Sequence, residues 1–425
     1  MLMLIVVIIF LMLSLLGLPI FFSFGVTAAL ACIFGDYPLQ IIAQRMMIGM
    51  DSFALLAVPG FIVAGDLMSQ GGISQRLVDF SNSLVAHLKG GLAMVTVLTG
   101  MIMGGISGSA VADTAAVATV LVPSMEKEKY PKDFAAAVVG SAGPLGNIIP
   151  PSIPMVIYSM VSGLSLLDLF LAGYVPGMMI GFSLMFFCHW VSKKKGFGRE
   201  TARFSPREVL VTFRRSILAV IMPLIIVGGV LSGVFTATES AMIGVVYAFF
   251  VAVFIYKEIS WRELPGLLLN SAKATAKLVI IMASASVFSY ISIREGVPDL
   301  FKDLMLGLSS NKYVILLALN IILLLLGCVI DILVATIILV PVIIPLAQVL
   351  GVDQLHIAMI FVINMSIGLL TPPVGYSLYV ASTIAQAPFE RVSRAAVPVV
   401  LVMAVILALV TVFPGLSLFV PNLFH

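Results

Sequence analysis

Apolar runs long enough to cross a bilayer fill most of the chain, and the polar stretches between them are short. A membrane-spanning helix needs about 20 consecutive apolar residues. Plain spans are predicted at 52–68, 169–190, 217–234, 239–256, 277–293 and 392–413. Amphipathic segments that suit the membrane interface are predicted at 37–51, 72–88, 261–269 and 297–308. The pattern is typical of an all-α polytopic membrane protein.

The apolar run at the N-terminus, residues 1–34, is interrupted at Gly17 and Pro19. It is too long for one straight span and short for two, so the number of spans there stays open. It has no basic segment ahead of it and no clear cleavage site. These features favour a retained membrane segment over a cleaved signal peptide.

One apolar run, 134–162, is interrupted near its middle. Two glycines and four prolines occupy the twelve positions 143–154, including the adjacent pair Pro150 and Pro151. Proline removes a backbone donor and clashes with the preceding turn, so the pattern predicts a broken helix. Exposed backbone at membrane depth is tolerated only where it is buried in protein or lines a wet cavity. A break here therefore favours an ion or solute site, and a kinked helix packed on its neighbours is the alternative.

The same pattern returns 222 residues later, because Pro150 and Pro151 match Pro372 and Pro373 at that shift and Gly146 matches Gly368. A second broken helix is therefore predicted at 357–385. Paired interrupted helices in two halves of a chain point to the binding site of a secondary transporter.

Two further segments predict re-entrant hairpins, at 90–123 with its tip at 105–109 and at 312–346 with its joint at 327–330. The arms of the first are shorter than a full span, and small residues at the tip permit a sharp turn. Short ordinary spans, or one long helix with a glycine-rich packing face, are the alternatives. The hairpins match at a shift of 218, Asp113 to Asp331, which an insertion near 347–352 would explain.

The distribution of basic residues orients the chain. Eight of the 23 basic residues lie in 192–215, so this connector is predicted to be cytoplasmic. The hairpins then enter from opposite sides, and the two repeats are inverted. Four regions follow: N-terminal scaffold helices and an interfacial arm at 1–51, a first repeat at 52–191, a basic loop and scaffold helices at 192–275, and a second repeat at 276–425.

Composition agrees with this picture, since 61% of the residues are hydrophobic and 10% are charged. The balance excludes a soluble domain, the long runs exclude an outer-membrane barrel, and a net charge of +3 gives no indication of nucleic acid. The three cysteines lie in apolar runs and do not suggest disulfides, and the four histidines have no metal-ligand spacing.

The hairpin tips and helix breaks are predicted to expose carbonyl and hydroxyl oxygens, which suit Na⁺. About two Na⁺ sites are expected, one in each half, where a tip meets a break. The predicted Na⁺ ligands are Ser107, Gly108, Gly143, Asn147 and Pro150 in the first half, and Gly327, Val329, Asp331, Gly368 and Thr371 in the second. The predicted substrate contacts are Ser107, Ser109, Asn147, Ser152, Thr371 and Gly375. The predicted hinges are Pro151, Pro372 and Pro373.

Charged residues near these segments admit two interpretations. Asp113 is either a functional acid within the membrane or an acidic helix cap, and the same holds for Asp331. Lys273, Lys277 and Arg294 flank the predicted span 277–293, and we interpret them as side chains that extend to the membrane interface.

Gly105-Ile106-Ser107-Gly108 fits the short G-x-S-G pattern of intramembrane serine proteases. A nucleophilic serine needs a base within reach, and His189 and His356 look interfacial. We therefore predict no enzyme. A channel is less favoured than a carrier, because inverted broken helices with hairpins suit a moving protein.

Three segments resemble the large membrane (DctM-like) subunit of TRAP, or tripartite ATP-independent periplasmic, transporters, which belong to the ion transporter superfamily. They are MGGISGSAVAD at 103–113, NIIPPS at 147–152 and LTPPVG at 370–375. The resemblance covers essentially the whole chain.

The resemblance implies an elevator-type, Na⁺-coupled symporter in the bacterial inner membrane that carries small organic acids, such as C4-dicarboxylates or sialic acids. It also implies two partners, a small four-helix membrane (DctQ-like) subunit and a soluble periplasmic substrate-binding (DctP-like) protein. The alternative is a stand-alone Na⁺- or H⁺-coupled anion carrier that needs no binding protein.

Overall fold

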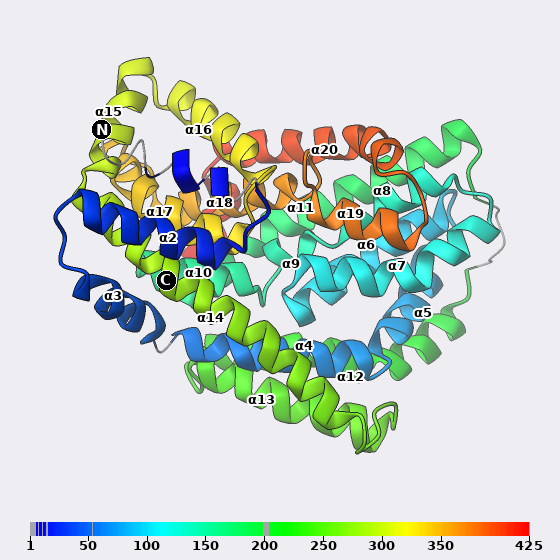
Figure 1. Ribbon diagram of the computed structural model, residues 1–425. Coiled ribbons are helices and arrows are strands. Elements are labelled where there is room, and N and C mark those ends of the chain that lie inside the picture. The colour runs from blue at the N-terminus through cyan, green and yellow to red at the C-terminus, as the bar shows by residue number, and fades with distance from the viewer. Residues whose placement is uncertain are drawn as a thin grey trace.

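The computed structural model describes residues 6–424 except 7, 11, 14, 15, 53 and 199–203. Most of the described residues are helical (Figure 1). The first elements are α2 (Ile20–Phe34), α3 (Gln40–Met50), the 3-10 helix η1 (Ala54–Leu56), α4 (Ala57–Gln70) and α5 (Ile73–Val85). The next are α6 (Gly91–Ser107), α7 (Ala110–Lys127), α8 (Lys132–Ala142), α9 (Leu145–Ile148), α10 (Ile153–Ser162) and α11 (Leu166–Lys195).

The middle of the chain forms α12 (Pro206–Leu231), α13 (Ala237–Phe249), the π-helical η2 (Phe250–Ile255) and α14 (Leu264–Arg294). The last elements are α15 (Val297–Leu308), α16 (Lys312–Gly327), α17 (Ile332–Val349), α18 (Gln354–Gly368), α19 (Tyr376–Ile384), α20 (Phe389–Val412), α21 (Gly415–Leu418) and α22 (Pro421–Phe424).

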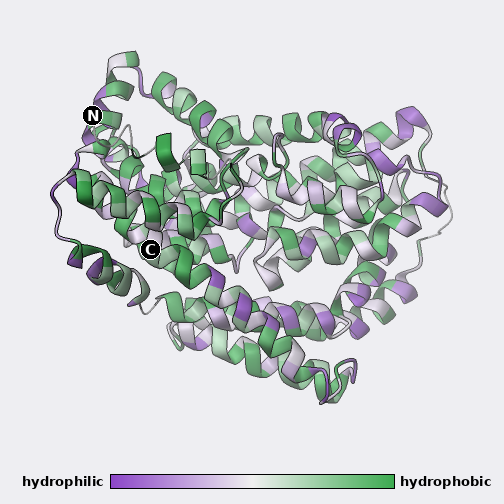
Figure 2. Cartoon of the chain, viewed as in Figure 1, coloured by the Kyte–Doolittle hydropathy of each residue, from purple (hydrophilic) through white to green (hydrophobic). Residues whose placement is uncertain are grey.

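Seven helical stretches among the described residues are long and apolar enough to cross a membrane, counting Lys132–Ser162 as one stretch through its break. Figure 2 shows hydrophobic residues over most of the helical body, and hydrophilic ones toward its two ends and along the lower row of helices that includes α4 and α14. The chain is therefore a helical multi-pass membrane protein, as its pattern predicts. Part of the N-terminal run, including residues 1–5, lies outside the described residues, and its span count stays a prediction.

Two predicted segments have different boundaries in the structure. The connector 192–215 is mostly helix, because α11 continues to Lys195 and α12 begins at Pro206 after its N-cap Ser205. Arg199 and Arg203 lie outside the described residues. The predicted interfacial segment 261–269 is not a separate element, since α14 begins at Leu264 and continues unbroken into the span, and its place at the membrane interface stays a prediction. In α11, α12 and α14 the helix thus extends past the polar residues at which the sequence predicted it to begin or end.

The second arms of the hairpins and the helix breaks match at one shift of 222 residues. Both α7 (Ala110–Lys127) and α17 (Ile332–Val349) have 18 residues, and their bounds differ by 222. The bounds of α8 and α18 begin with the same difference. The shift of 218 for the hairpins is therefore wrong, and no insertion is needed. The error arose because α17 contains Pro341 and Pro345, four residues apart, so that Pro123 can be matched to either one.

The halves interlock around the two helix breaks. Figure 1 shows α8 toward the right and α10 toward the left of the view, whereas α18 lies toward the left and α19 toward the right. The broken helices thus run in opposite directions. Beyond its break each helix packs on the hairpin of the other half, α10 on α17 and α19 on α7.

A second group of helices borders this body. The long α14 packs on α2, α3 and α4, and α13 packs on α4. A Cβ at Gly60 of α4 would lie 2.9 Å from the Cβ of Ala241 in α13, so these two helices approach closely. The amphipathic α3 places Arg45 3.7 Å from the ring centroid of Tyr290 in α14. Beside it, Tyr37 donates a 2.6 Å hydrogen bond to Glu295, which raises the pKa of Tyr37.

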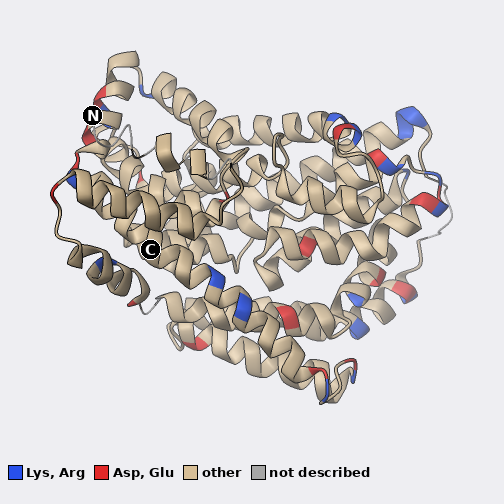
Figure 3. Ribbon diagram, in the orientation of Figure 1, with Lys and Arg blue, Asp and Glu red and all other residues tan. Residues whose placement is uncertain are grey.

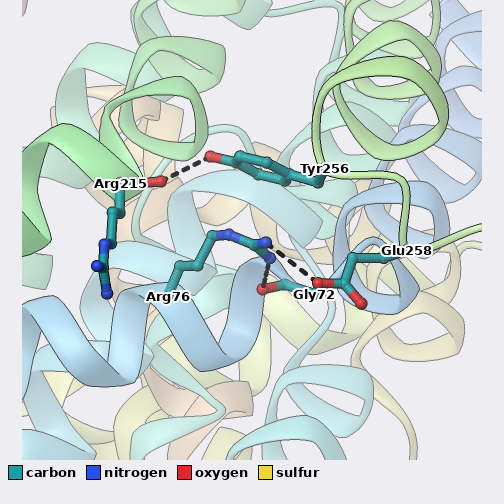
Figure 4. A network of polar contacts seen from close by, with 5 residues as sticks. All are labelled: Gly72, Arg76, Arg215, Tyr256 and Glu258. Atoms are coloured by element: carbon teal, nitrogen blue, oxygen red, sulfur yellow. Dashed lines mark hydrogen bonds and ion pairs between the residues drawn. The ribbon is translucent and has the colours of Figure 1, made fainter.

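A polar network joins α5 to the end of η2 (Figure 4). Arg76 donates hydrogen bonds to the Gly72 carbonyl at 2.7 Å and to Glu258 at 3.1 Å. Its guanidinium lies 3.8 Å from the ring centroid of Tyr256, whose hydroxyl donates to the carbonyl of Arg215 at 2.9 Å. The arginine is both paired and stacked on an aromatic ring, so it links α5 to the residues that follow η2, which Tyr256 joins to α12.

Candidate functional site

The first hairpin turns where the sequence places its tip. Helix α6 ends at Ser107, Gly108 has a φ of +62°, and Ser109 is the N-cap of α7. A positive φ strains residues that have a Cβ, and a Cβ at Gly108 would also lie 2.8 Å from the carbonyl oxygen of Pro151. Glycine is therefore required there both by the turn and by the close approach of the helix break.

The first break lies directly against this turn. Helix α9 ends at Ile148 and α10 begins at Ile153, with the adjacent Pro150 and Pro151 joined by a cis peptide bond. The Ile153 amide donates a 3.4 Å hydrogen bond to the Gly108 carbonyl. Within the break, the Ser152 hydroxyl donates to the Asn147 carbonyl at 2.7 Å. The tip and the break of the first half thus meet through their backbones, as the sequence predicts.

The second half repeats the arrangement. Helix α16 ends at Gly327, Asp331 is the N-cap of α17, and the bond between Pro372 and Pro373 is also cis. The Val374 amide donates a 3.3 Å hydrogen bond to the carbonyl of Cys328. The α16 and α18 backbones approach so closely that a Cβ at Gly327 would lie 3.3 Å from the Cα of Gly368.

The two acidic residues have different environments. Asp113 is 1% exposed, accepts a 2.5 Å hydrogen bond from the Ser107 hydroxyl, and has no partner for Oδ2 among the described residues. A Cβ at Gly146 would lie 2.6 Å from this Oδ2. The helix-cap interpretation is therefore wrong for Asp113. It is right for Asp331, which accepts a 2.9 Å hydrogen bond from the Leu333 amide.

A cavity of about 380 Å³ lies where the two tips approach α4 and α14. Such a volume lies within the usual range for small-molecule sites, roughly 300–1,000 Å³. Of the predicted site residues, the lining includes Ser107, Gly108, Ser109, Asp113, Asn147 and Asp331. The side-chain amide nitrogen of Asn147 is buried without a partner among the described residues. Polar groups left unsatisfied in this way are available to a ligand.

Other predicted site residues lie outside the lining of this cavity, and several have internal partners. The carbonyls of Gly143 and Gly368 accept hydrogen bonds from Gly146 and Thr371 at 2.9 and 3.0 Å. The Thr371 hydroxyl donates to the Ile367 carbonyl at 3.0 Å. Gly375, with a φ of +53°, is the N-cap of α19. The remaining members lie at the breaks or the second tip: Pro150, Pro151, Ser152, Gly327, Val329, Pro372 and Pro373.

The sequence interpretation missed the residues that α4 and α14 contribute to the cavity. These are Ile62, Gly65, Asp66 and Ser69 from α4, and Ala274, Lys277 and Leu278 from α14. The Ser271 hydroxyl donates a 2.5 Å hydrogen bond to Asp66. Lys277 has no ion-pair partner among the described residues.

The earlier interpretation of Lys277 as an interfacial side chain is wrong. It rested on a span beginning at residue 277, whereas α14 extends over 31 residues from Leu264 to Arg294. Lys277 is therefore near the middle of the helix and lines the cavity. A signal was present in the sequence, because the apolar residues Leu267, Leu268 and Leu269 precede the lysines.

Ser107 lacks the surroundings of a nucleophile. Its hydroxyl donates to Asp113 and accepts a 3.1 Å hydrogen bond from the Ser109 amide. The ring nitrogens of His189 and His356 contact Lys89 and Ser417, respectively. These contacts fit a serine that orders the hairpin turn.

The fold and the site define a helical multi-pass membrane protein with two broken helices, two hairpin turns, and a cavity where the turns approach α4 and α14. A sequence profile described as "Tripartite ATP-independent periplasmic transporter, DctM component" matches residues 7–416. The chain therefore belongs to the DctM family of TRAP transporter large permease proteins.

Several curated relatives support this assignment. The chain is 40% identical over 401 residues to the "2,3-diketo-L-gulonate TRAP transporter large permease protein YiaN" of Escherichia coli, covering 94% of each chain. It is 38% identical over 401 residues to the "C4-dicarboxylate TRAP transporter large permease protein DctM" of Pseudomonas aeruginosa, again covering 94% of each. It is 36% identical over 409 residues to the "Sialic acid TRAP transporter large permease protein SiaM" of Vibrio cholerae, covering 96% of each.

Among solved structures, the YdaH transporter of Alcanivorax borkumensis has a similar fold. The TM-score is 0.64 at 13% sequence identity, with 89% of each chain covered. At this identity the likeness concerns the fold alone.

Proposed function

We propose that this chain takes up small organic acids across the bacterial inner membrane, coupled to Na⁺ and by an elevator movement. The observation that carries the proposal is the paired arrangement of tips and breaks. In each half a hairpin turn accepts a backbone hydrogen bond from the helix break, from Ile153 to Gly108 and from Val374 to Cys328. Irregular backbone at membrane depth, repeated in two antiparallel copies beside a cavity, suits a secondary transporter.

Na⁺ would bind where the tips meet the breaks. The first half offers oxygens that a hard cation prefers, namely the unpartnered Oδ2 of Asp113 and, on the same cavity lining, the Ser107 hydroxyl and the amide oxygen of Asn147. A buried carboxylate oxygen without a hydrogen-bond donor is stabilised by a cation. The second half would hold a matching ion near Cys328, Gly368 and Thr371, giving about two sites in the chain.

The substrate would bind in the cavity. Lys277 is the only basic residue among those that line it, and it lies in the middle of α14 without an acidic partner in the described chain. A charge at the centre of a membrane helix costs about 2.5–3.5 kcal/mol on insertion scales, so such residues are retained for function. The N-terminal residues of α10, Ile153 and Pro154, also line the cavity, and helix N-termini favour anions.

The substrate class follows from this chemistry. The relatives are named for 2,3-diketo-L-gulonate, C4-dicarboxylates and sialic acid, which are all organic acids. A lysine ammonium binds a carboxylate as a point charge and does not distinguish the rest of the molecule. We therefore propose the class of substrate and leave the individual acid to experiment.

The movement would carry the hairpins and broken helices against the group formed by α2–α4 and α12–α14. The cavity lies between these two groups, since α4 and α14 line one side and the tips line the other. The moving part would then consist of the repeats at 52–191 and 276–425, without α4 and without the part of α14 that falls in the second repeat. Two partners are proposed from the family: a small four-helix membrane subunit and a periplasmic binding protein.

Uptake into proteoliposomes tests the proposal. The chain would be reconstituted with its small subunit, with the binding protein outside, and offered radiolabelled succinate, N-acetylneuraminate and 2,3-diketogulonate. One of these acids is expected to accumulate only with an inward Na⁺ gradient and the binding protein. Uptake driven by a pH gradient without Na⁺ would contradict the coupling. Equal uptake without the binding protein would favour the stand-alone carrier.

A further inference from the structure

A basic pocket lies far from the central cavity, at the end of the molecule where α8 and α20 begin and α11 ends. Its volume is about 670 Å³, and its charged lining residues are Asp133, Lys194, Lys195, Arg391 and Arg394. Four basic groups thus face one acid. Figure 3 shows basic and acidic residues at the right-hand end of the view, where α8 begins.

The four basic side chains are free to bind an anion. None of them has an ion-pair partner in the described chain. Lys194 lies 5.2 Å from the ring centroid of Trp190, and Lys195 lies 5.7 Å from that of Phe197. The carboxylate of Asp133 already accepts a 3.0 Å hydrogen bond from the Phe134 amide. The pocket therefore has an excess of positive charge that no carboxylate within it neutralises.

A second, apolar groove lies next to this pocket. It has a volume of about 430 Å³ and is lined by Phe182, Ser183, Phe186, Phe187, Trp190 and Val402. Phe187 and Trp190 also line the basic pocket, so the two spaces are adjacent. Phe186 is 71% exposed and Trp190 is 52% exposed on this face of the chain.

Helical spacing gives the two spaces a fixed order. On α11, Phe182, Phe186, Trp190 and Lys194 follow each other at intervals of four residues, which places them on one face. On the neighbouring α20, Arg394, Pro398 and Val402 repeat the same interval. Both helices therefore present basic residues at their ends and apolar residues deeper in the membrane.

We infer that the basic pocket and the apolar groove together bind one anionic phospholipid. Its phosphate would lie among Lys194, Lys195, Arg391 and Arg394, and an acyl chain would lie over Phe186, Phe187 and Val402. Basic pockets between helices on the cytoplasmic side suit lipid phosphates, and tryptophan favours the level of the headgroups. A soluble anion would fill the pocket and leave the apolar groove uncovered.

Trp190 makes the inference measurable. The chain has two tryptophans, Trp190 and Trp261, so Trp261→Phe leaves a single fluorophore at the proposed site. This full-length variant would be placed in phosphatidylcholine nanodiscs that contain a low fraction of lipid brominated on its acyl chains. Brominated phosphatidylglycerol is expected to quench Trp190 at a lower fraction than brominated phosphatidylcholine does. Equal quenching by the two lipids, or none by either, would overturn the inference.

Two matched quadruple variants locate the charge. Changing Lys194, Lys195, Arg391 and Arg394 to Gln should lower the preference for phosphatidylglycerol at least about tenfold, since each basic residue near an anionic surface contributes roughly a factor of five. Changing Lys193, Arg207, Arg214 and Arg215 to Gln removes as many charges from the same side and should preserve the preference. If both variants lose the preference for phosphatidylglycerol equally, the preference comes from net charge alone and a specific lipid site is contradicted.

A third variant separates a lipid from a free phosphate. Val402→Phe fills the apolar groove without adding a tryptophan and should weaken quenching by brominated phosphatidylglycerol, while inorganic phosphate should fail to compete. If phosphate competes and Val402→Phe has no effect, the pocket is an anion site and the lipid assignment is wrong. None of these variants touches the central cavity, so the result is independent of the proposed transport function.

Discussion

The two helix breaks have the same local geometry and opposite surroundings. Every residue from Leu145 to Tyr158 around the first break is buried. At the second break Pro372, Pro373 and Tyr376 are exposed, and Thr371 and Val374 are half-buried. The shift of 222 residues thus preserves backbone geometry and does not preserve environment.

The neighbouring helix explains much of the difference. In α11 a Cβ at Gly173 would overlap the Ile148 carbonyl, and one at Gly177 would lie 2.6 Å from the Ile149 side chain. The matching positions of α20, 222 residues later, are Ala395 and Val399. Larger side chains hold helix backbones farther apart, so two glycines permit α11 to cover the first break. A few changes in side-chain size can therefore make one break of a duplicated chain buried (closed) and the other exposed (open).

The largest effect is expected from closing that approach. Gly173→Val should force α11 away from the first break, and overpacking a core costs about 1–3 kcal/mol or more. We expect a large loss of thermal stability and no measurable uptake. The matched change Ala395→Val should lower stability by less than about 1 kcal/mol. Gly228→Val controls for valine in a helix, because a Cβ there meets nothing within 4 Å. Similar losses of stability in Gly173→Val and Ala395→Val would show that the glycines of α11 do not cause the difference in burial between the two breaks.

The next effect concerns Lys277, which faces the first-half tip across the cavity. Lys277→Gln should raise the KM for uptake about ten- to hundredfold, since hydrogen bonds to charged groups contribute roughly 1.5–3 kcal/mol. Lys277→Arg should restore part of the affinity. Lys273→Gln, one turn away on α14 and outside the lining, is the matched control and should leave the KM unchanged. If Lys277→Gln has an unchanged KM and its uptake still depends on Na⁺, Lys277 does not bind the substrate, and the proposed function is not contradicted.

The two acidic residues provide a third contrast between the halves. Asp113→Asn removes the charge beside the first tip and should weaken the apparent Na⁺ affinity about tenfold or more, as is typical when a group that supports a metal site is lost. Asp331→Asn should change stability little, because Asn caps a helix about as well as Asp does. The measurement is initial uptake against external Na⁺ concentration. A larger loss of Na⁺ affinity in Asp331→Asn than in Asp113→Asn would indicate that the Na⁺ site that matters more for uptake lies in the second half.

Sequence reasoning located the irregular segments because proline and glycine act locally. Pro150, Pro151 and Gly108 interrupt helices for reasons contained in a few neighbouring residues. The depth of Lys277 was missed because it depends on where α14 begins. The register of the second hairpin was misassigned because Pro341 and Pro345 are one helical turn apart. The lining of the cavity, with Asp66 and Lys277, depends on tertiary packing that no local pattern encodes.

The smallest perturbation tests the exposure of the breaks directly. Ser152 is 1% exposed, and Val374, its match at a shift of 222, is half-buried. In a background without Cys32, Cys188 and Cys328, cysteine at either position should support folding. A membrane-impermeant maleimide should modify Val374→Cys roughly tenfold faster or more, since a closed site reacts only after local opening. Equal rates would show that the two breaks share one environment in solution.

The same pair can also report movement. If the antiparallel halves exchange surroundings during transport, conditions that favour the opposite state should accelerate labelling of Ser152→Cys and slow labelling of Val374→Cys. A Na⁺ gradient with a transported acid supplies such a condition. Rates that stay fixed while uptake proceeds would mean that the asymmetry is built into α11 and α20 and plays no part in alternating access. Opposite changes in the two labelling rates would mean that each break is closed in one state of the transport cycle and open in the other.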